Sequence, residues 1–168
     1  LEGHKMGITE LRANPGGGQL LSSSIDKTLR LWDVRTLRLL RVFERHDSQV
    51  YSVRFTPDGK YAVSGGRDGY IMIWDLNTGQ PSKSIKAHEQ IVWSVAVSPD
   101  GRFAVSGSSD ETARIWHLVT RDRIGENVDV RGEIKPWLVS QHPGASMFRK
   151  CARCHSLGPD GVRRSGPH

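Results

Sequence analysis

The 168-residue sequence predicts a mainly β fold of three repeats, followed by a linker and a short helical segment. Two observations predict the β part: three consecutive segments superimpose under one constant shift, and each alternates short apolar runs with tight-turn residues. A third observation, a C-x-x-C-H motif that begins at Cys151, sets the end of the chain apart. We therefore divide the chain into residues 1–121, 122–142 and 143–168.

The shift aligns residues of unlike types without a gap. The aligned positions are His4, His46 and His88; Pro15, Pro57 and Pro99; Ser22, Ser64 and Ser106; Asp26, Asp68 and Asp110; and Trp32, Trp74 and Trp116. A spacing shared by so many unlike residues indicates a repeated structural unit.

Short strands are predicted inside each repeat. In the second repeat, apolar runs span residues 50–55, 61–65 and 70–76. Turn residues separate them, first Pro57-Asp58-Gly59 and then residues 66–69. Because short strands joined by tight turns pair with their neighbours, we expect antiparallel sheets in residues 1–121.

This array resembles the WD-repeat family of β-propellers. Gly3-His4 resembles the Gly-His pair of that family, and Trp32-Asp33 and Trp74-Asp75 resemble its terminal Trp-Asp pair, whereas the third repeat ends in Trp116-His117. The resemblance implies one four-stranded blade per repeat and a platform that binds other proteins. Since known propellers have at least about four blades, we expect further blades before Leu1.

The same resemblance implies a buried, hydrogen-bonded set of His, Ser, Asp and Trp in each blade. The second repeat offers His46, Ser64, Asp68 and Trp74, and the third offers His88, Ser106, Asp110 and Trp116. Buried polar groups must satisfy one another, and an indole N–H needs an acceptor. His, Asp and Ser could also form a hydrolase triad, but a set that recurs in every repeat indicates a structural device.

Two aromatic residues, Tyr51 and Trp93, occupy the position that Thr9 holds in the first repeat. We place this position at the start of the first strand of a blade, near the loop face on which the family binds partners. Two interpretations stay open for the aromatic pair. The rings pack between blades, or they contact a partner protein.

The periodicity stops after Arg121. Residues 123–136 are polar and mixed in charge, without a sustained strand or helix pattern. Residues 122–142 are therefore predicted to be a linker.

The run Cys151-Ala152-Arg153-Cys154-His155 is typical of covalent haem attachment. Two thiols three positions apart can each add to one vinyl group of a porphyrin, and the histidine that follows can bind the iron. Two other functions fit the same residues. One is a redox dithiol, and the other is a zinc site of Cys151, Cys154, His155 and His168, although adjacent Cys and His rarely point at one tetrahedral metal.

Residues 143–168 resemble the start of a class I c-type cytochrome. Phe148 lies in a predicted short helix before the motif, and Gly166-Pro167 resembles the Gly-Pro pair that follows it in that family. The resemblance implies that Cys151 and Cys154 hold haem c, that His155 is the proximal ligand and that the Pro167 carbonyl orients His155. It also implies a bacterial periplasmic location. No Met after the motif offers a distal ligand.

Composition narrows the function further. The net charge is +6, and residues 143–168 carry about +4 of it, which suits a solvated surface or docking to an acidic redox partner. No run of apolar residues approaches the roughly 18 of a membrane helix, so no membrane span is expected. The basic residues are not interleaved with base-stacking aromatic residues, so binding to nucleic acid is not expected. We expect an electron carrier, not an enzyme, that docks through its WD repeats; the alternative is an interaction scaffold without haem.

Overall fold

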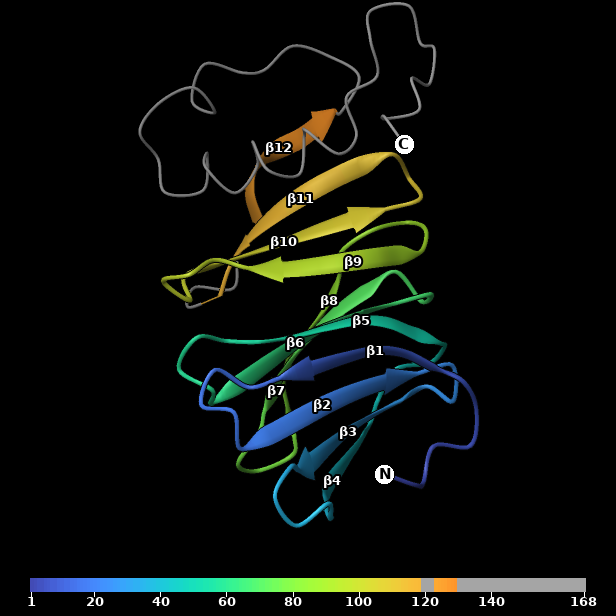
Figure 1. Ribbon diagram of the computed structural model, residues 1–168. Coiled ribbons are helices and arrows are strands. Elements are labelled where there is room, and N and C mark those ends of the chain that lie inside the picture. The colour runs from blue at the N-terminus through green and yellow to red at the C-terminus, as the bar shows by residue number, and fades with distance from the viewer. Residues whose placement is uncertain (119–122, 130–168) are drawn as a thin grey trace, which may run out of the picture. The chain divides into compact units, whose positions relative to one another are not determined.

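The computed structural model describes residues 1–118 and 123–129 of the chain, and in this part it contains strands and no helix. Three antiparallel sheets of four strands each follow one another along the sequence (Figure 1). The prediction of a mainly β fold with three repeated sheets is confirmed. The strands are β1 (Ile8–Ala13), β2 (Gln19–Ser24), β3 (Thr28–Asp33) and β4 (Leu39–Glu44) in sheet 1; β5 (Val50–Phe55), β6 (Tyr61–Gly66), β7 (Tyr70–Asp75) and β8 (Pro81–Lys86) in sheet 2; and β9 (Val92–Val97), β10 (Phe103–Ser108), β11 (Thr112–His117) and β12 (Arg123–Asp129) in sheet 3.

Each sheet is a meander in which strands adjacent in sequence pair with one another. The tight turns come where the turn residues predict them. Gly59 and Gly69 adopt positive φ angles of 67° and 77°, a conformation that suits glycine. A Cβ at Gly69 would also lie only 2.3 Å from the backbone oxygen of His88, so this turn has no room for a side chain.

The sheets pack face to face through apolar side chains. β5 contacts β1 of the preceding sheet and β9 of the following one, and Figure 1 shows the three sheets layered in this order. The core between sheets 1 and 2 includes Leu21, Leu31, Val53 and Trp74. A second core of the same kind lies between sheets 2 and 3. Successive side chains along a strand of sheet 2 point to opposite faces. One set therefore reaches the core with sheet 1, and the other set reaches the core with sheet 3.

The fourth strand of sheet 3 corrects the predicted linker. Residues 122–142 are predicted to connect two domains, yet Arg123–Asp129 forms β12, which pairs antiparallel with β11. The strands β4, β8 and β12 begin at equivalent positions of the three repeats. This strand escaped prediction because it carries no apolar pattern: the fourth strand is farthest from β1, β5 and β9, and its residues are largely polar.

The remaining predictions for the end of the chain concern residues that the structure does not describe. They are the rest of the linker, residues 130–142, and the helical start of a cytochrome domain in residues 143–168. In the described part, no helix is long and apolar enough to cross a membrane.

Candidate functional site

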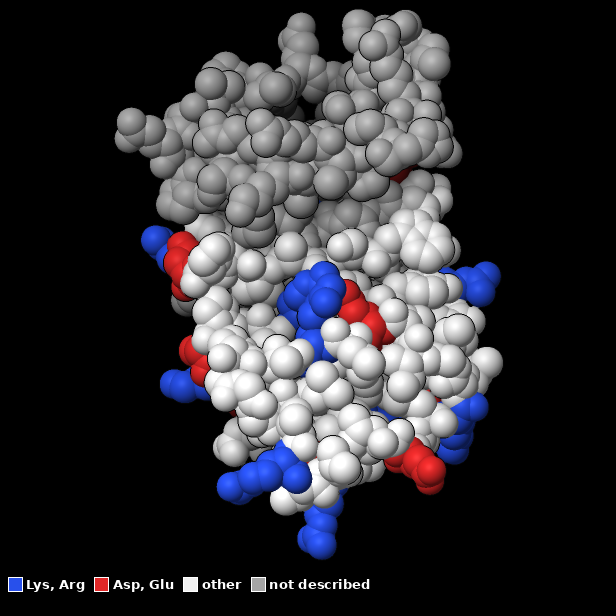
Figure 2. Space-filling model, viewed as in Figure 1, with Lys and Arg blue, Asp and Glu red and all other residues white. Residues whose placement is uncertain are grey.

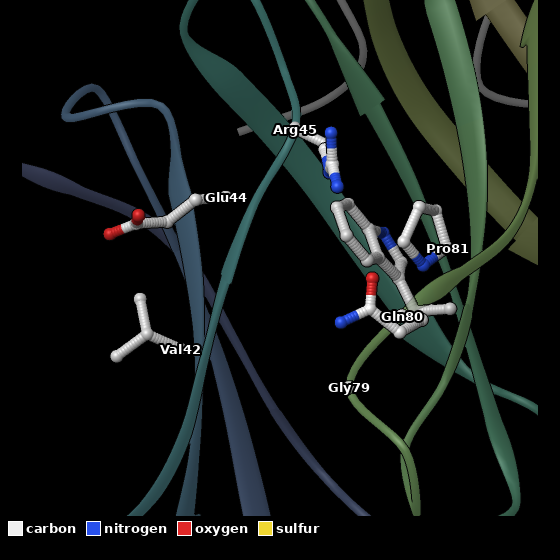
Figure 3. Close-up of a pocket in the computed structure, with 7 residues that line it drawn as sticks. Val42, Glu44, Arg45, Gly79, Gln80 and Pro81 are labelled. Carbon is white, nitrogen blue, oxygen red and sulfur yellow. The ribbon is translucent and has the colours of Figure 1, made fainter.

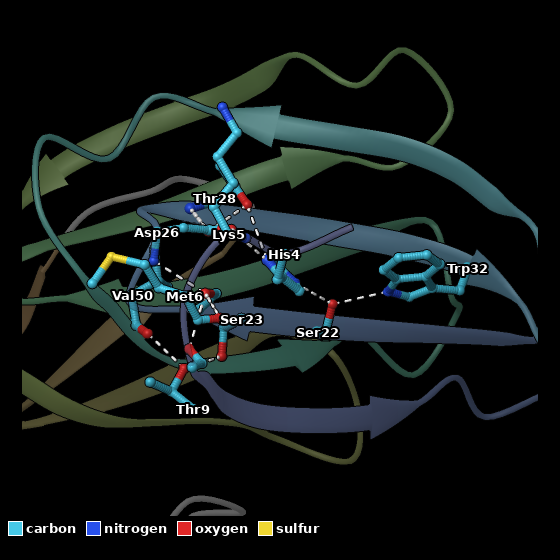
Figure 4. A network of polar contacts seen from close by, with 12 residues as sticks. His4, Lys5, Met6, Thr9, Ser22, Ser23, Asp26, Thr28, Trp32 and Val50 are labelled. Carbon is cyan, nitrogen blue, oxygen red and sulfur yellow. Dashed lines mark hydrogen bonds and ion pairs between the residues drawn. The ribbon is translucent and has the colours of Figure 1, made fainter. Parts of the chain in front are cut away.

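A buried polar set links the strands of sheet 1 (Figure 4). Nδ1 of His4 lies 2.8 Å from Oδ2 of Asp26, and Nε2 of His4 lies 2.7 Å from Oγ of Ser22. The indole N–H of Trp32 donates to the same Ser22 oxygen over 2.8 Å. The sequence prediction named such sets only in the second and third repeats, although the repeat spacing also marks these four residues.

The structure brings the predicted residues of sheets 2 and 3 together in the same way. Nδ1 of His46 lies 2.8 Å from Asp68, its Nε2 lies 2.8 Å from Ser64, and Trp74 donates to Ser64 over 2.8 Å. In sheet 3 the distances are 2.8 Å from His88 to Asp110, 2.7 Å from His88 to Ser106 and 2.9 Å from Trp116 to Ser106. With a neutral imidazole, the donors run in one direction from indole to hydroxyl to imidazole to carboxylate.

The aspartate of each set also holds a turn. Oδ1 of Asp110 accepts the amide and the hydroxyl of Thr112, over 3.0 and 2.7 Å. Burial raises the pKa of Asp110, but the hydrogen bonds from Thr112 and His88 outweigh burial and lower it to about 2. Burial likewise raises the pKa of Asp68, but the hydrogen bond from His46 and the backbone hydrogen bonds outweigh burial and lower it. Each of these two carboxylates therefore accepts hydrogen bonds at both of its oxygens.

These sets are not suited to hydrolysis. The serines Ser22, Ser64 and Ser106 are buried, and the oxygen of each already accepts an indole N–H. A nucleophile must reach its substrate, which a buried hydroxyl inside a packed sheet does not. The geometry supports a structural role that fixes the third strand of a blade against the second.

The aromatic pair Tyr51 and Trp93 lies at the start of β5 and β9. Their ring centroids are 4.8 Å apart with an interplanar angle of 42°, so the two side chains join neighbouring sheets. Trp93 is nevertheless 52% exposed, and Tyr51 is half-buried. The rings therefore pack on each other between sheets, and part of this aromatic surface stays exposed to solvent.

Two hollows lie between neighbouring sheets. One, of about 350 Å³, is lined by Val42, Glu44, Arg45, Trp74, Gly79, Gln80 and Pro81. Figure 3 shows Arg45, Gln80 and Pro81 near one another, whereas Val42 and Glu44 point away from them. The other, of about 570 Å³, lies beside the turns at Asp58 and Asp100. The carboxylates of these two turns are already hydrogen-bonded to Thr56 and Ser98.

Charge and metal-binding groups add no second site in the described part of the chain. No group of three or more His, Cys, Asp or Glu residues there could hold a metal ion. On the face seen in Figure 2, Lys, Arg, Asp and Glu side chains are scattered among uncharged ones. The predicted haem residues Cys151, Cys154, His155 and Pro167, and the alternative zinc ligand His168, lie outside the described residues.

Comparison with known proteins agrees with a propeller blade repeated three times. The family described as "WD domain, G-beta repeat" matches residues 1–33, 37–75 and 79–117, which together are more than half of the chain. The chain belongs to this WD40 family.

Many solved structures are similar to the chain, and two of them are described below. "Structure of U3-55K" is 28% identical with a TM-score of 0.73, and the match covers 76% of this chain and 41% of that one. "Crystal structure of RRP9 WD40 repeats" is 28% identical with a TM-score of 0.72, and the match covers 74% of this chain and 39% of that one. The chain thus spans less than half the length of these structures.

Proposed function

We propose that the chain is a protein-interaction module whose binding surface is centred on Tyr51 and Trp93. The observation that carries this proposal is the exposure of Trp93, 52%, beside a second aromatic ring. A large aromatic side chain in water is typical of an interface anchor, because it supplies much apolar area at little conformational cost. The buried polar sets support the same proposal, since they hold a rigid scaffold and offer no reactive group.

Matched variants test whether this surface binds a partner protein. The wild-type chain, Trp93→Ala and Leu37→Ala are each used to purify bound proteins from the native source, and each protein recovered is then titrated against the purified chains. Leu37 is the control because it is 66% exposed and lies in the turn between β3 and β4. Truncating a hot-spot tryptophan costs about 2 kcal/mol or more, which weakens binding roughly 30-fold. Equal affinity for the wild type and Trp93→Ala contradicts the proposal.

We propose a second function, haem binding, for residues 143–168. The observation that carries it is that Gly166-Pro167 follows the C-x-x-C-H motif, as a Gly-Pro pair does in the c-type cytochromes that this segment resembles. Cys151 and Cys154 would form the thioether links to haem c, and His155 would bind the iron with Pro167 orienting its ring. Two thiols and one imidazole are the donor set that this attachment requires. Bound haem supplies one-electron transfer, so the module would be an electron carrier in the bacterial periplasm with an acidic redox partner.

Covalent haem has a direct readout. The chain is expressed together with a haem-ligation system and stained for haem peroxidase activity on a denaturing gel. A stain that survives denaturation, and is lost in the double variant Cys151→Ser/Cys154→Ser, is the expected result. An unstained wild type rejects haem c and leaves the interaction module as the function, and zinc measured in the same sample separates the zinc alternative.

A further inference from the structure

The strand ends that carry Tyr51 and Trp93 form one surface with two kinds of connection. In each sheet a loop precedes the first strand, and the turn between the second and third strands lies beside this loop. One backbone hydrogen bond of 2.8 to 3.0 Å joins turn to loop in every sheet, from Ile25 to Gly7, from Arg67 to Gln49 and from Ser109 to Ile91. Each acceptor lies two residues before Thr9, Tyr51 or Trp93. We call these loops and turns, together with the aromatic pair, the Trp93 end of the sheets.

Charge at the Trp93 end changes sign from sheet 1 to sheet 3. Two positions can be compared in every sheet, one directly after the repeated histidine and one directly after the repeated aspartate. They hold Lys5 and Lys27 in sheet 1, Asp47 and Gly69 in sheet 2, and Glu89 and Glu111 in sheet 3. The five charged residues among them are exposed. Arg67, in the same turn as Gly69, balances Asp47, so the row runs from positive through mixed to negative in the order in which the sheets pack (Figure 1).

Two of these charged residues occupy a backbone conformation that favours glycine. The φ angles of Lys27 and Glu111 are 73° and 64°, and Gly69 at the equivalent position has a φ of 77°. A left-handed backbone is unfavourable for a residue with a side chain, and strained residues of this kind gather at functional sites. The strain indicates that the two charged side chains have a role at this surface that glycine does not fulfil.

A further blade would not compete for the Trp93 end. The three sheets pack through their faces, and the two cores lie between these faces. The Trp93 end lies instead at the ends of the strands. A blade added beside sheet 1 would therefore lengthen the row of strand ends and leave Lys5 and Lys27 in their places.

Resting on the binding surface proposed above, we infer the charge pattern of its partner. The partner presents one linear segment of a protein, with acidic residues over sheet 1, an apolar residue against Tyr51 and Trp93, and basic residues over sheet 3. A linear segment suits the surface because the contact points form a row, with a few side chains from each sheet. Charges of opposite sign fix the register of such a segment and reject like charges. Nucleic acid does not fit, since Glu89 and Glu111 repel phosphate groups.

Peptides displayed on phage test this charge pattern with a defined probe. A random peptide library is selected on the full chain, and peptides that also bind Trp93→Ala are removed. The enriched peptides should carry an acidic block and a basic block with an apolar residue between them, and salt should weaken their binding by screening the charges. Enriched peptides without the two blocks overturn the inference but leave the proposed surface intact. A library without any Trp93-dependent binder overturns both.

Charge reversal in the chain tests the two ends of the row. Lys5→Glu/Lys27→Glu should weaken binding of an enriched peptide about tenfold, because attraction at two exposed positions becomes repulsion. The matched control Lys60→Glu/Arg102→Glu reverses two exposed charges at the opposite ends of the strands, and it should leave the affinity unchanged. Equal affinity for the wild type and Lys5→Glu/Lys27→Glu overturns the inference, even where Trp93→Ala abolishes binding.

A second double variant keeps the test decisive if the first is poorly folded, and circular dichroism checks each variant. Selection on Glu89→Lys/Glu111→Lys should enrich uniformly acidic peptides in place of those with two blocks. An unchanged pattern of enriched peptides overturns the inference.

The row of charges is also complementary to a second copy of itself, because a twofold axis would place sheet 1 of one copy opposite sheet 3 of the other. Analytical ultracentrifugation of the wild type and of Trp93→Ala separates this case. The wild type is expected to be monomeric over the concentrations used for the peptide titrations. A wild-type dimer that is lost in Trp93→Ala would assign the surface to a second copy and would overturn the inference of a separate partner segment.

Discussion

Two kinds of position in the repeats behave in opposite ways. The His, Ser, Asp and Trp positions hold the same residues in all three sheets, and their hydrogen-bond distances are 2.7, 2.8 or 2.9 Å in every case. The position at the start of the first strand of each sheet instead holds Thr9 in β1, Tyr51 in β5 or Trp93 in β9, and its side chain is partly or largely exposed. Repetition thus marks what each blade needs in order to fold, and variation marks where the blades can differ in what they contact.

The comparison is sharpest at His88, whose removal should have the largest effect on stability. Its side chain is fully buried between Asp110 and Ser106. In His88→Ala, Asp110 and Ser106 each lose a hydrogen-bond partner and a fully buried imidazole is removed, which should lower the free energy of unfolding by about 3 kcal/mol. Urea unfolding followed by tryptophan fluorescence measures the change, with the exposed neighbour in Glu89→Ala as the control. A loss no larger than that of the control would show that the set is not structural.

The serine at the centre of a set should come next. In Ser64→Ala the indole N–H of Trp74 and Nε2 of His46 both lose their partner inside the core. Leaving a buried donor unsatisfied costs about 2 kcal/mol. The matched control is Ser84→Ala on the exposed side of β8, expected within about 0.5 kcal/mol of the wild type. Equal effects of the two alanine variants would contradict a role for the hydroxyl.

Acid should weaken the same sets through their carboxylates. The folded pKa of Asp110 is lowered from an ordinary value of 3.8 to about 2 by its hydrogen bonds. Stabilisation by a lowered pKa is complete above the ordinary value and is lost as the pH falls towards the folded one. About 2 kcal/mol should thus disappear between roughly pH 4 and pH 2. Unfolding measured across this window should be less pH-dependent in Asp110→Asn, whereas Asp47→Asn, at an exposed position, should retain the full slope.

Much of the fold follows from the sequence because it repeats. The predicted strands of the second repeat agree with β5, β6 and β7 to within one residue at each end, since apolar runs and glycine turns mark them directly. The resemblance implies a fourth strand in each blade, but the sequence pattern did not locate it, because a strand such as Pro81–Lys86 has few apolar residues. The exposure of Trp93 could not be predicted either, because an aromatic residue at a strand start suits a core as well as an interface.

The smallest effect on stability is expected at this variable position. Trp93→Thr gives β9 the residue type that β1 has at Thr9, and it removes a ring that is half in solvent and touches Tyr51. Loss of this aromatic pair should lower the free energy of unfolding by about 1 kcal/mol or less. The same substitution should nevertheless abolish most partner binding, if exposure rather than packing explains the tryptophan. Urea unfolding and partner titration on the same samples measure the two effects. A stability loss as large as that of His88→Ala would show that Trp93 is a core residue, and the contrast between repeated and variable positions would then not hold.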